Sequence, residues 1–157
     1  VGVDNSQAML DRCLKNTQKP LDGRPLELRC EDIQTTPIEN ASIVVLNFTL
    51  QFIDKSERLE LLQHIRRGLK PGGILLLSEK IQFGNERMQS ELFELHHDFK
   101  RSHGYSDLEI SQKRNSLEDV LISETLEAHK ARLSEAGFTA SETWLQCFNF
   151  VSLLALR

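Results

Sequence analysis

One apolar run in the middle of the chain limits the possible fold more than any other feature of the sequence. Residues 42–48 read Ser-Ile-Val-Val-Leu-Asn-Phe, so four apolar residues, three of them β-branched, follow one another without a polar break. Such a run predicts a strand that is covered on both faces, which is typical of a central strand in a parallel sheet. The chain is therefore expected to adopt an α/β fold.

A second apolar run, residues 74–77, follows a helical segment and the helix-breaking sequence Pro-Gly-Gly at 71–73. The order strand, helix, strand predicts a right-handed crossover between two parallel strands. We expect a doubly wound, mostly parallel sheet with helices on both faces, in which ligands bind beyond the carboxyl ends of the strands. Asn47 lies at such an end and is a candidate ligand contact, although it can equally be a residue that merely ends its strand.

Two acidic residues occupy corresponding places after the first two predicted strands. The Asp4 carboxylate can accept two hydrogen bonds from a ribose diol. The Asp32 carboxylate can accept from the exocyclic amine of an adenine, while the amide of Ile33 donates to a ring nitrogen. The simpler interpretation makes Asp4 or Asn5 part of a helix cap and leaves Asp32 in a solvated loop. The strands are expected at residues 1–3 and 26–30, with a turn at 20–25 before the second.

Polar residues after three separate strands favour a common ligand site over three unrelated strand ends, because parallel strands end at the same edge of a sheet. The helix between the two apolar runs is expected to be structural, with a capping box formed by Asp54 and Glu57 at its start. Glu79, after the second run, is a weak catalytic candidate, since carboxylates are more often found on the surface.

Two helices are predicted between residues 85 and 120, inserted between strands of the sheet. Ser106 and Glu109 form a capping box for the second helix. Inserted helices usually form a lid over the ligand cleft or a dimer surface. Arg114 lies in a cluster of basic residues there, and an arginine on a lid can grip a carboxylate through two parallel hydrogen bonds, although a solvated helix face is the default. The first helix carries a stripe of Met88, Leu92, Leu95, His96 and Phe99.

His96 and His97 do not suggest a metal site. They are adjacent in the sequence and therefore about 100° apart around a helix, so they do not readily share one metal ion. The end of the chain predicts a helix at residues 124–136, stopped by Gly137, and then two antiparallel strands at 139–147 and 150–156. By analogy, such an ending often completes the sheet of class I methyltransferase folds.

Composition narrows the classes of function. The 157 residues carry 19 basic and 23 acidic side chains, a net charge of −4, without a basic block that would follow a phosphate backbone. We therefore expect no direct nucleic-acid partner. Apolar runs of membrane-spanning length and a leader pattern are both missing, so we expect a soluble, cytoplasmic protein with one domain at residues 1–157. Three widely spaced cysteines, Cys13, Cys30 and Cys147, predict buried, reduced thiols.

The chain opens on what reads as a strand in progress and without a Met. A parallel sheet of this kind normally begins with a strand, a glycine-rich turn and a helix. The sequence contains no glycine-rich turn, since Gly72 and Gly73 follow a helix and precede a strand, where glycine stops a helix. The first strand and the glycine-rich loop are therefore expected to be absent from this chain.

Several strings of the sequence resemble the S-adenosylmethionine-dependent methyltransferase superfamily. They are Asp4-Asn5-Ser6 and residues 44–52, 69–73 and 76–80. Longer and more unusual strings resemble, more narrowly, the carboxy-S-adenosyl-L-methionine synthase family. These are residues 96–101, 104–106, 109–114 and 146–150. The resemblance extends over the whole chain but begins after the first strand and glycine-rich loop of that family.

The resemblance implies a Rossmann-like class I methyltransferase fold and a particular reaction. Enzymes of this family convert S-adenosyl-L-methionine and prephenate to carboxy-S-adenosyl-L-methionine and phenylpyruvate, without a metal. A partner enzyme then uses the product to carboxymethylate a wobble uridine of tRNA. The resemblance makes Arg114 the ligand of the product carboxylate. It also makes five residues contacts of the adenosine and methionine parts, namely Asp4, Asn5, Asp32, Ile33 and Asn47.

Other functions stay open at the level of the sequence. The sheet pattern alone fits an ordinary S-adenosylmethionine-dependent methyltransferase that acts on a small molecule or on tRNA, although the net charge of −4 disfavours tRNA. A polypeptide without the first strand and loop can also be an inactive fragment. The inserted helices favour a homodimer.

Overall fold

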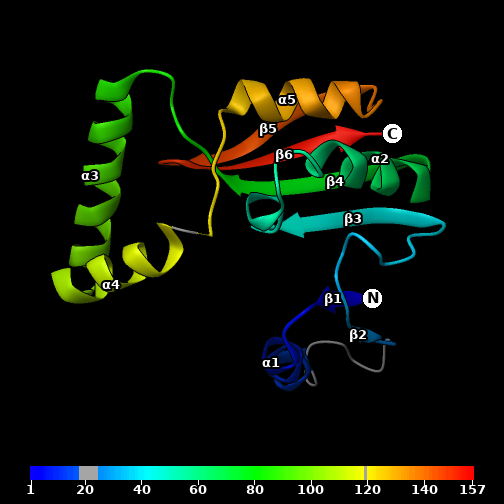
Figure 1. The fold of residues 1–157 in the computed structure, drawn as a ribbon, viewed down its shortest axis with the longest axis horizontal. Coiled ribbons are helices and arrows are strands. Elements are labelled where there is room, and N and C mark those ends of the chain that lie inside the picture. Colours follow the sequence, from blue (N-terminus) through cyan, green and yellow to red (C-terminus); the bar gives the residue numbers. More distant parts are fainter. Residues whose placement is uncertain (18–24, 119) are drawn as a thin grey trace. The chain divides into compact units, whose positions relative to one another are not determined.

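The chain begins, as the sequence predicts, with a strand, a helix and a second strand (Figure 1). The computed structural model describes residues 1–17, 25–118 and 120–157, with the backbone alone at 113–118, so the turn expected around Asp22 and Gly23 lies outside the described residues. The chain divides into two units, residues 1–38 and 39–157. In the first unit, β1 (Gly2–Asp4) and β2 (Leu28–Cys30) pair in parallel, and α1 (Gln7–Thr17) connects to β1.

The second unit contains a four-stranded sheet in the order β3-β4-β6-β5 (Figure 1). β3 and β4 run parallel, as their crossover predicts, whereas β6 is antiparallel to both β4 and β5. Its strands are β3 (Ala41–Asn47), β4 (Leu69–Lys80), β5 (Ala140–Cys147) and β6 (Phe150–Leu156). Its helices are η1 (Leu50–Phe52), α2 (Arg58–Gly68), α3 (Glu86–Ser102), α4 (Asp107–Glu118) and α5 (Leu126–Glu135).

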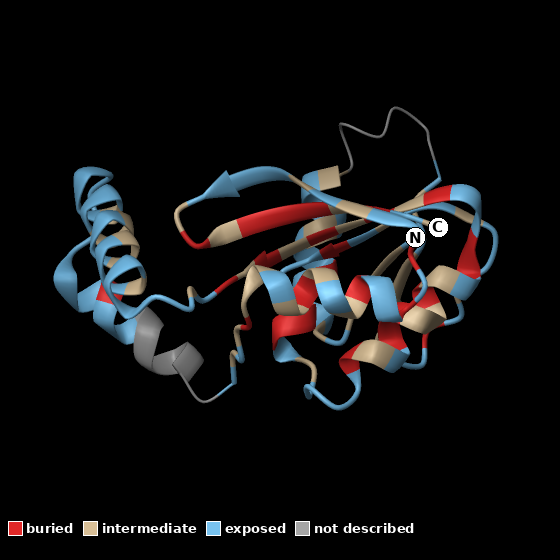
Figure 2. Ribbon diagram, turned by 90° about the horizontal axis from the view of Figure 1, so that it is seen from above, coloured by how far each residue is buried: buried red, intermediate tan, exposed pale blue. Residues whose placement is uncertain are grey.

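The core of this unit lies between one face of the sheet and the helices α2 and α5 (Figures 1 and 2). Alternate residues of β4 and β6 point into it, because side chains alternate between the two faces of a strand. Strand register places Leu77 opposite Leu153, and both are fully buried. The other buried residues of this core include Leu46, Leu61, Leu62, Ile65, Leu75, Leu133 and Ala155.

The second face of β3 differs from the sequence prediction. Ile43 and Val45 are 57% and 56% exposed, although the apolar run predicted a strand covered on both sides. Within residues 39–157, α2 and α5 cover only one face, and β3 is an edge strand that pairs with β4 alone. The prediction is wrong for this unit because an apolar run does not reveal which segment supplies a second covering layer.

Some of the residues predicted to begin or end helices do so in the structure, and others do not. The capping box of α4 is confirmed, since the Ser106 amide donates to the Glu109 carboxylate at 2.9 Å and the Glu109 amide donates back to the Ser106 hydroxyl at 3.3 Å. Gly137 has a φ of +92° just after α5, as a helix-ending glycine requires. The capping box predicted for α2 is wrong, because Asp54 accepts from the amide and hydroxyl of Ser56 instead.

Two smaller predictions also need correction. The Pro-Gly-Gly sequence at 71–73 does not end α2, because α2 ends at Gly68 and β4 begins at Leu69, so that residues 70–73 form an irregularity between the pairs of β4 with β3. The cysteines are free thiols but are not buried, since Cys30 and Cys147 are exposed and Cys13 is half-buried. None of the helices in the described ranges combines the length and apolar character that crossing a bilayer requires.

Candidate functional site

Asp4, Asn5 and Asp32 lie together where β1 and β2 end. Asp4 pairs with Cys30 across the two parallel strands, so Asp32 follows the neighbouring strand end by two residues. The side-chain amide of Asn5 donates to Asp32 Oδ1 at 3.0 Å. Three of the predicted nucleoside contacts are thus close neighbours in the first unit, and what they bind stays a prediction.

The hydrogen bonds of Asp4 and Asp32 also serve the local turns. Asp4 Oδ1 accepts from the Ser6 amide at 2.8 Å, which stabilises the start of α1 as the simpler interpretation supposed. The Asp32 carbonyl accepts from the Thr35 amide at 3.1 Å in the turn that contains the half-buried Ile33. A carboxylate has two oxygens and several lone pairs, so one accepted hydrogen bond does not exhaust it. Both the Asp4 and the Asp32 carboxylate can therefore still accept a hydrogen bond from a ligand.

Asn47 is the last residue of β3 and is exposed. It pairs with Ser78 of β4, and the next residue, Phe48, has a φ of +57°. The Phe48 amide donates to the Ser78 carbonyl at 2.8 Å, so the chain turns sharply off the sheet directly after Asn47. Asn47 belongs to the second unit, and its approach to Asp4 and Asp32 stays a prediction.

Arg114 lies in helix α4, and its side chain is outside the part of the chain that the structure describes. Its grip on a carboxylate therefore stays a prediction. α3 and α4 lie beyond the carboxyl end of β4 (Figure 1). The predicted apolar stripe of α3 is present but is not buried, since Met88, Leu95 and Phe99 are about half exposed.

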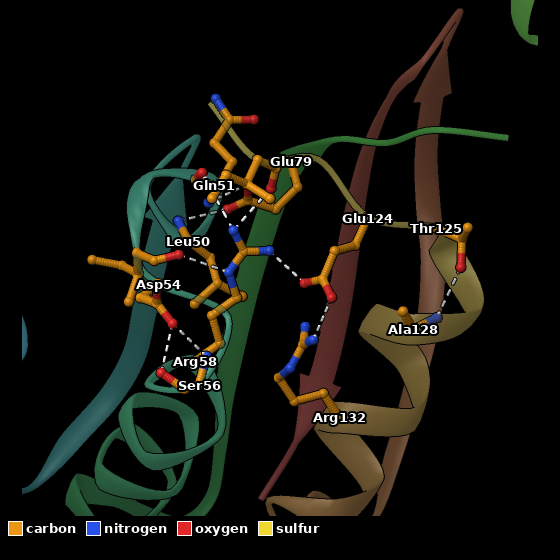
Figure 3. Close-up of polar contacts among 12 residues, drawn as sticks. Leu50, Gln51, Asp54, Ser56, Arg58, Glu79, Glu124, Thr125, Ala128 and Arg132 are labelled. Carbon is orange, nitrogen blue, oxygen red and sulfur yellow. Dashed lines mark hydrogen bonds and ion pairs between the residues drawn. The ribbon is translucent and has the colours of Figure 1, made fainter. Parts of the chain in front are cut away.

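Glu79 is a buried carboxylate with a strongly shifted pKa, and the sequence prediction that it lies on the surface is wrong. Its side chain is 1% exposed. Its two oxygens accept from the amides of Leu50 and Gln51 at 2.9 and 3.0 Å (Figure 3). Burial raises the pKa of Glu79 to about 7, against the opposing effect of these hydrogen bonds and of Arg58. Glu79 therefore fixes the η1 turn that follows Asn47.

Arg58 connects that turn to the segment before α5. The guanidinium is fully buried and donates to the Ile53 carbonyl at 2.9 Å and the Ile122 carbonyl at 2.8 Å. It also forms a hydrogen-bonded ion pair with Glu124, which in turn accepts from Arg132 at 2.7 Å (Figure 3). Burial alone would raise the pKa of Glu124, but the two arginines outweigh it and lower the pKa.

The burial of Arg58 and of Glu79 carried a signal in the sequence. Arg58 precedes Leu61, Leu62 and Ile65 at helical spacing, so it belongs to the buried stripe of α2. Glu79 alternates with Leu75 and Leu77 along β4 and so shares their covered face. Charge suggested the surface for Glu79, and no burial was predicted for Arg58, whereas periodicity indicates the core for both residues.

His129 is a fourth buried titratable group, after Glu79, Arg58 and Glu124. It is 2% exposed on α5, and neither ring nitrogen has a hydrogen-bond partner within the described ranges. Burial lowers the pKa of His129 to about 4, so the imidazole is neutral near pH 7. Residues 1–17, 25–118 and 120–157 contain no group of three or more His, Cys, Asp or Glu side chains arranged to hold a metal ion.

Comparisons with known proteins relate the chain to methyltransferases and to a named group of synthases. A family model described as a methyltransferase domain matches residues 1–77. The carboxy-S-adenosyl-L-methionine synthase of Hahella chejuensis is 57% identical over 157 residues, covering 100% of this chain and 63% of that protein. The synthase of Geobacter metallireducens is 58% identical over 160 residues, covering 100% of this chain and 65% of that protein. The chain therefore spans less than two thirds of the length of these relatives.

Solved structures with low sequence identity share the fold. The pyocyanin biosynthetic protein PhzM matches 99% of this chain and 42% of its own with a TM-score of 0.70 at 18% identity. A putative O-methyltransferase from Nostoc punctiforme matches 99% of this chain and 44% of its own with a TM-score of 0.69 at 16% identity. Over all of its residues the chain is similar in sequence to proteins named carboxy-S-adenosyl-L-methionine synthase, and its fold is that of the class I methyltransferases.

Proposed function

We propose that the protein of which these residues form part is a carboxy-S-adenosyl-L-methionine synthase. The observation that carries the proposal is the identity of 50% to 58% with proteins of that name over the whole chain. The paired strand ends with Asp4, Asn5 and Asp32 support it, because polar groups at this edge of a doubly wound sheet suit a nucleoside.

The proposed substrates are S-adenosyl-L-methionine and prephenate. Loss of the ring carboxylate as carbon dioxide and of the ring hydroxyl as hydroxide converts prephenate to phenylpyruvate. The hydroxide and one proton of the sulfonium methyl group form water, which leaves an ylide that the positive sulfur stabilises. The ylide carbon then bonds to carbon dioxide, giving the carboxylate of the product. The protein must supply a dry pocket and a cation for the new carboxylate.

The proposed roles follow the chemistry of the side chains. Asp4 accepts from the ribose hydroxyls and Asp32 from the adenine amine, with Asn5 positioned by its hydrogen bond to Asp32. Ile33 offers its backbone amide to the adenine, and Asn47 contacts the methionine part. Arg114 holds the new carboxylate through two parallel hydrogen bonds. No metal is needed in this scheme.

We also propose a cellular role for the product and a location for the protein. The product serves a second enzyme that modifies a wobble uridine of tRNA, so this protein needs no direct contact with nucleic acid, in line with its net charge of −4. We place the protein in the cytoplasm as a homodimer, with the inserted helices α3 and α4 at the dimer surface or over the cleft.

The test is a product assay on the full-length protein, meaning a polypeptide of the relatives' length that contains these 157 residues. Incubation with S-adenosyl-L-methionine and prephenate is expected to give a nucleoside heavier by one carbon dioxide, observed by mass spectrometry. Arg114→Ala is expected to cost about 2 to 5 kcal/mol of product-state binding and to abolish most synthesis while S-adenosyl-L-methionine still binds. Simple methyl transfer without the carboxylated product would contradict the proposal.

A further inference from the structure

Lys80 is a partly buried cation without a carboxylate partner among the described residues. It is the last residue of β4 and half-buried, and its Nζ lies 5.9 Å from the centroid of the Phe93 ring. Burial lowers the pKa of Lys80, and the nearby Lys100 lowers it further. A cation that has lost part of its hydration and meets a second cation favours an anion from outside the chain.

An aromatic cluster adjoins this lysine. We define the cluster as Phe48, Phe93, His96, Phe148 and Phe150. The ring centroid of His96 lies 5.1 Å from that of Phe150 and 5.5 Å from that of Phe148, and the ring centroid of Phe48 lies 5.8 Å from that of Phe150. The cluster joins the end of β3, helix α3 and the β5–β6 turn. Its rings are only partly buried, with Phe48 38% exposed.

Strand register places Lys80 and Phe150 on the same side of the sheet as Asn47. Lys80 pairs with Phe150, and Asn47 pairs with Ser78, two residues before Lys80 on β4. Paired and alternate residues share one face, which is opposite to the face of the buried Glu79. The cation and the rings thus lie beside the residue proposed to contact the methionine part of the nucleoside.

We propose that Lys80 and the aromatic cluster bind the carboxyl donor as a cyclic carboxylate, with its ring on the aromatic side chains and its retained carboxylate on Lys80 Nζ. The inference rests on the proposed function and adds the residues that select the second substrate. Rings prefer offset or edge-on contacts with aromatic side chains, and an ammonium binds a carboxylate through charge-assisted hydrogen bonds. The carboxylate that departs must face the sulfonium methyl, so the carboxylate on Lys80 is the one that phenylpyruvate keeps.

The test compares three variants of the full-length protein: Lys80→Met, Lys80→Arg and Lys70→Met. Lys70 is the matched control, because it is exposed at the other end of the same strand. Lys80→Met is expected to raise the KM for prephenate and the inhibition constant of phenylpyruvate by about 10- to 100-fold. The Kd for S-adenosyl-L-methionine should stay within twofold. Lys80→Arg should recover part of the loss, and Lys70→Met should match the wild type.

Two further readouts keep the inference distinct from the proposed function. Calorimetric titration with phenylpyruvate measures the site without turnover, so Lys80-dependent binding supports the inference even if no carboxylated product forms. Phe150→Leu is a second variant, in which Lys80 is intact. It is expected to weaken the binding of phenylpyruvate at least fivefold. Unchanged prephenate KM and phenylpyruvate binding in Lys80→Met, or an equal loss of S-adenosyl-L-methionine affinity, would overturn the inference.

Discussion

Glu79 shows how one residue can hold the geometry of a strand end. Its carboxylate replaces water as the acceptor for the amides of Leu50 and Gln51, two residues that follow the sharp turn after Asn47. A buried carboxylate is costly unless it is hydrogen-bonded, and the pKa of about 7 reflects that cost. Glu79 is therefore a positioning residue for Asn47, at a distance of one turn.

The raised pKa of Glu79 predicts a pH dependence of stability. Its folded pKa of about 7 lies above the unfolded value of 4.5, so the folded chain keeps a proton that the unfolded chain releases between these values. The stabilisation is fully present below pH 4.5 and is lost as the pH rises through 7. The shift corresponds to roughly 3 kcal/mol. In Glu79→Gln this loss should vanish, as measured by urea unfolding from pH 4.5 to 8.

His129 provides the internal comparison for that experiment. Its lowered pKa gives a slope of the opposite sign, because stability is lost as the pH falls from 6.5 toward 4. Glu79→Gln leaves this slope in place, so the difference between wild type and variant isolates Glu79. Parallel pH profiles for the two proteins would contradict the assignment.

For single residues, positions at strand ends were easier to predict from the sequence than burial. The proximity of Asp4, Asn5 and Asp32 could be predicted because strand ends are readable from the chain, and what these residues bind stays a prediction. Arg58 and Glu79 were missed because charged side chains usually avoid the core, so their periodic positions were not given weight. Buried pairs of this kind depend on contacts between distant segments, such as Arg58 with Glu124, which no local pattern contains.

At the level of elements, Arg58 ties three segments together. Its guanidinium joins the η1 turn, the start of α2 and the segment at 122–124 through hydrogen bonds to Ile53, Ile122 and Glu124. A buried ion pair that loses one partner leaves an uncompensated charge and unsatisfied carbonyl groups. The arrangement explains why η1 and the approach to α5 keep fixed positions beside the sheet.

Arg58→Met should therefore be strongly destabilising, although methionine fits an apolar helix stripe. Loss of the guanidinium leaves Glu124 with Arg132 alone, and the expected decrease in the free energy of unfolding is about 3 to 5 kcal/mol. Chemical denaturation measures it, with Arg67→Met as the control, because Arg67 is exposed near the end of the same helix. A decrease below 1 kcal/mol would show that the buried network does not stabilise the fold.

Helices, strands and their order were largely predictable, whereas their covering layers were not. The crossover of β3 and β4, the hairpin of β5 and β6 and the glycine stop of α5 followed from local chemistry. The exposed face of β3 and the open stripe of α3 were not foreseen, since burial depends on what packs against an element. The capping box predicted at Asp54 for α2 was wrong because the Asp54 carboxylate accepts a hydrogen bond from the nearby Ser56 hydroxyl.

At the level of the whole molecule, the fold and the sequence relatives contribute different parts of the proposal, because the fold is shared with other methyltransferases and only the relatives carry the synthase name. The sequence alone predicted a class I methyltransferase fold, and solved structures at 16% to 18% identity share it. The relatives named as synthases match the whole of this chain, and the chain covers 63% to 65% of their length. In the proposal, the strand ends bind the nucleoside, while Lys80, Arg114 and the aromatic cluster select the carboxyl donor.

The most direct measurement is a crystal structure of the full-length protein with S-adenosyl-L-methionine bound. The account predicts that Asp4 and Asp32 hydrogen-bond to the ribose and the adenine, that Asn47 contacts the methionine part of the same molecule, and that Arg114 faces the sulfonium methyl. A nucleoside bound elsewhere, or Asp4, Asp32 and Asn47 directed away from a common hollow, would contradict the account.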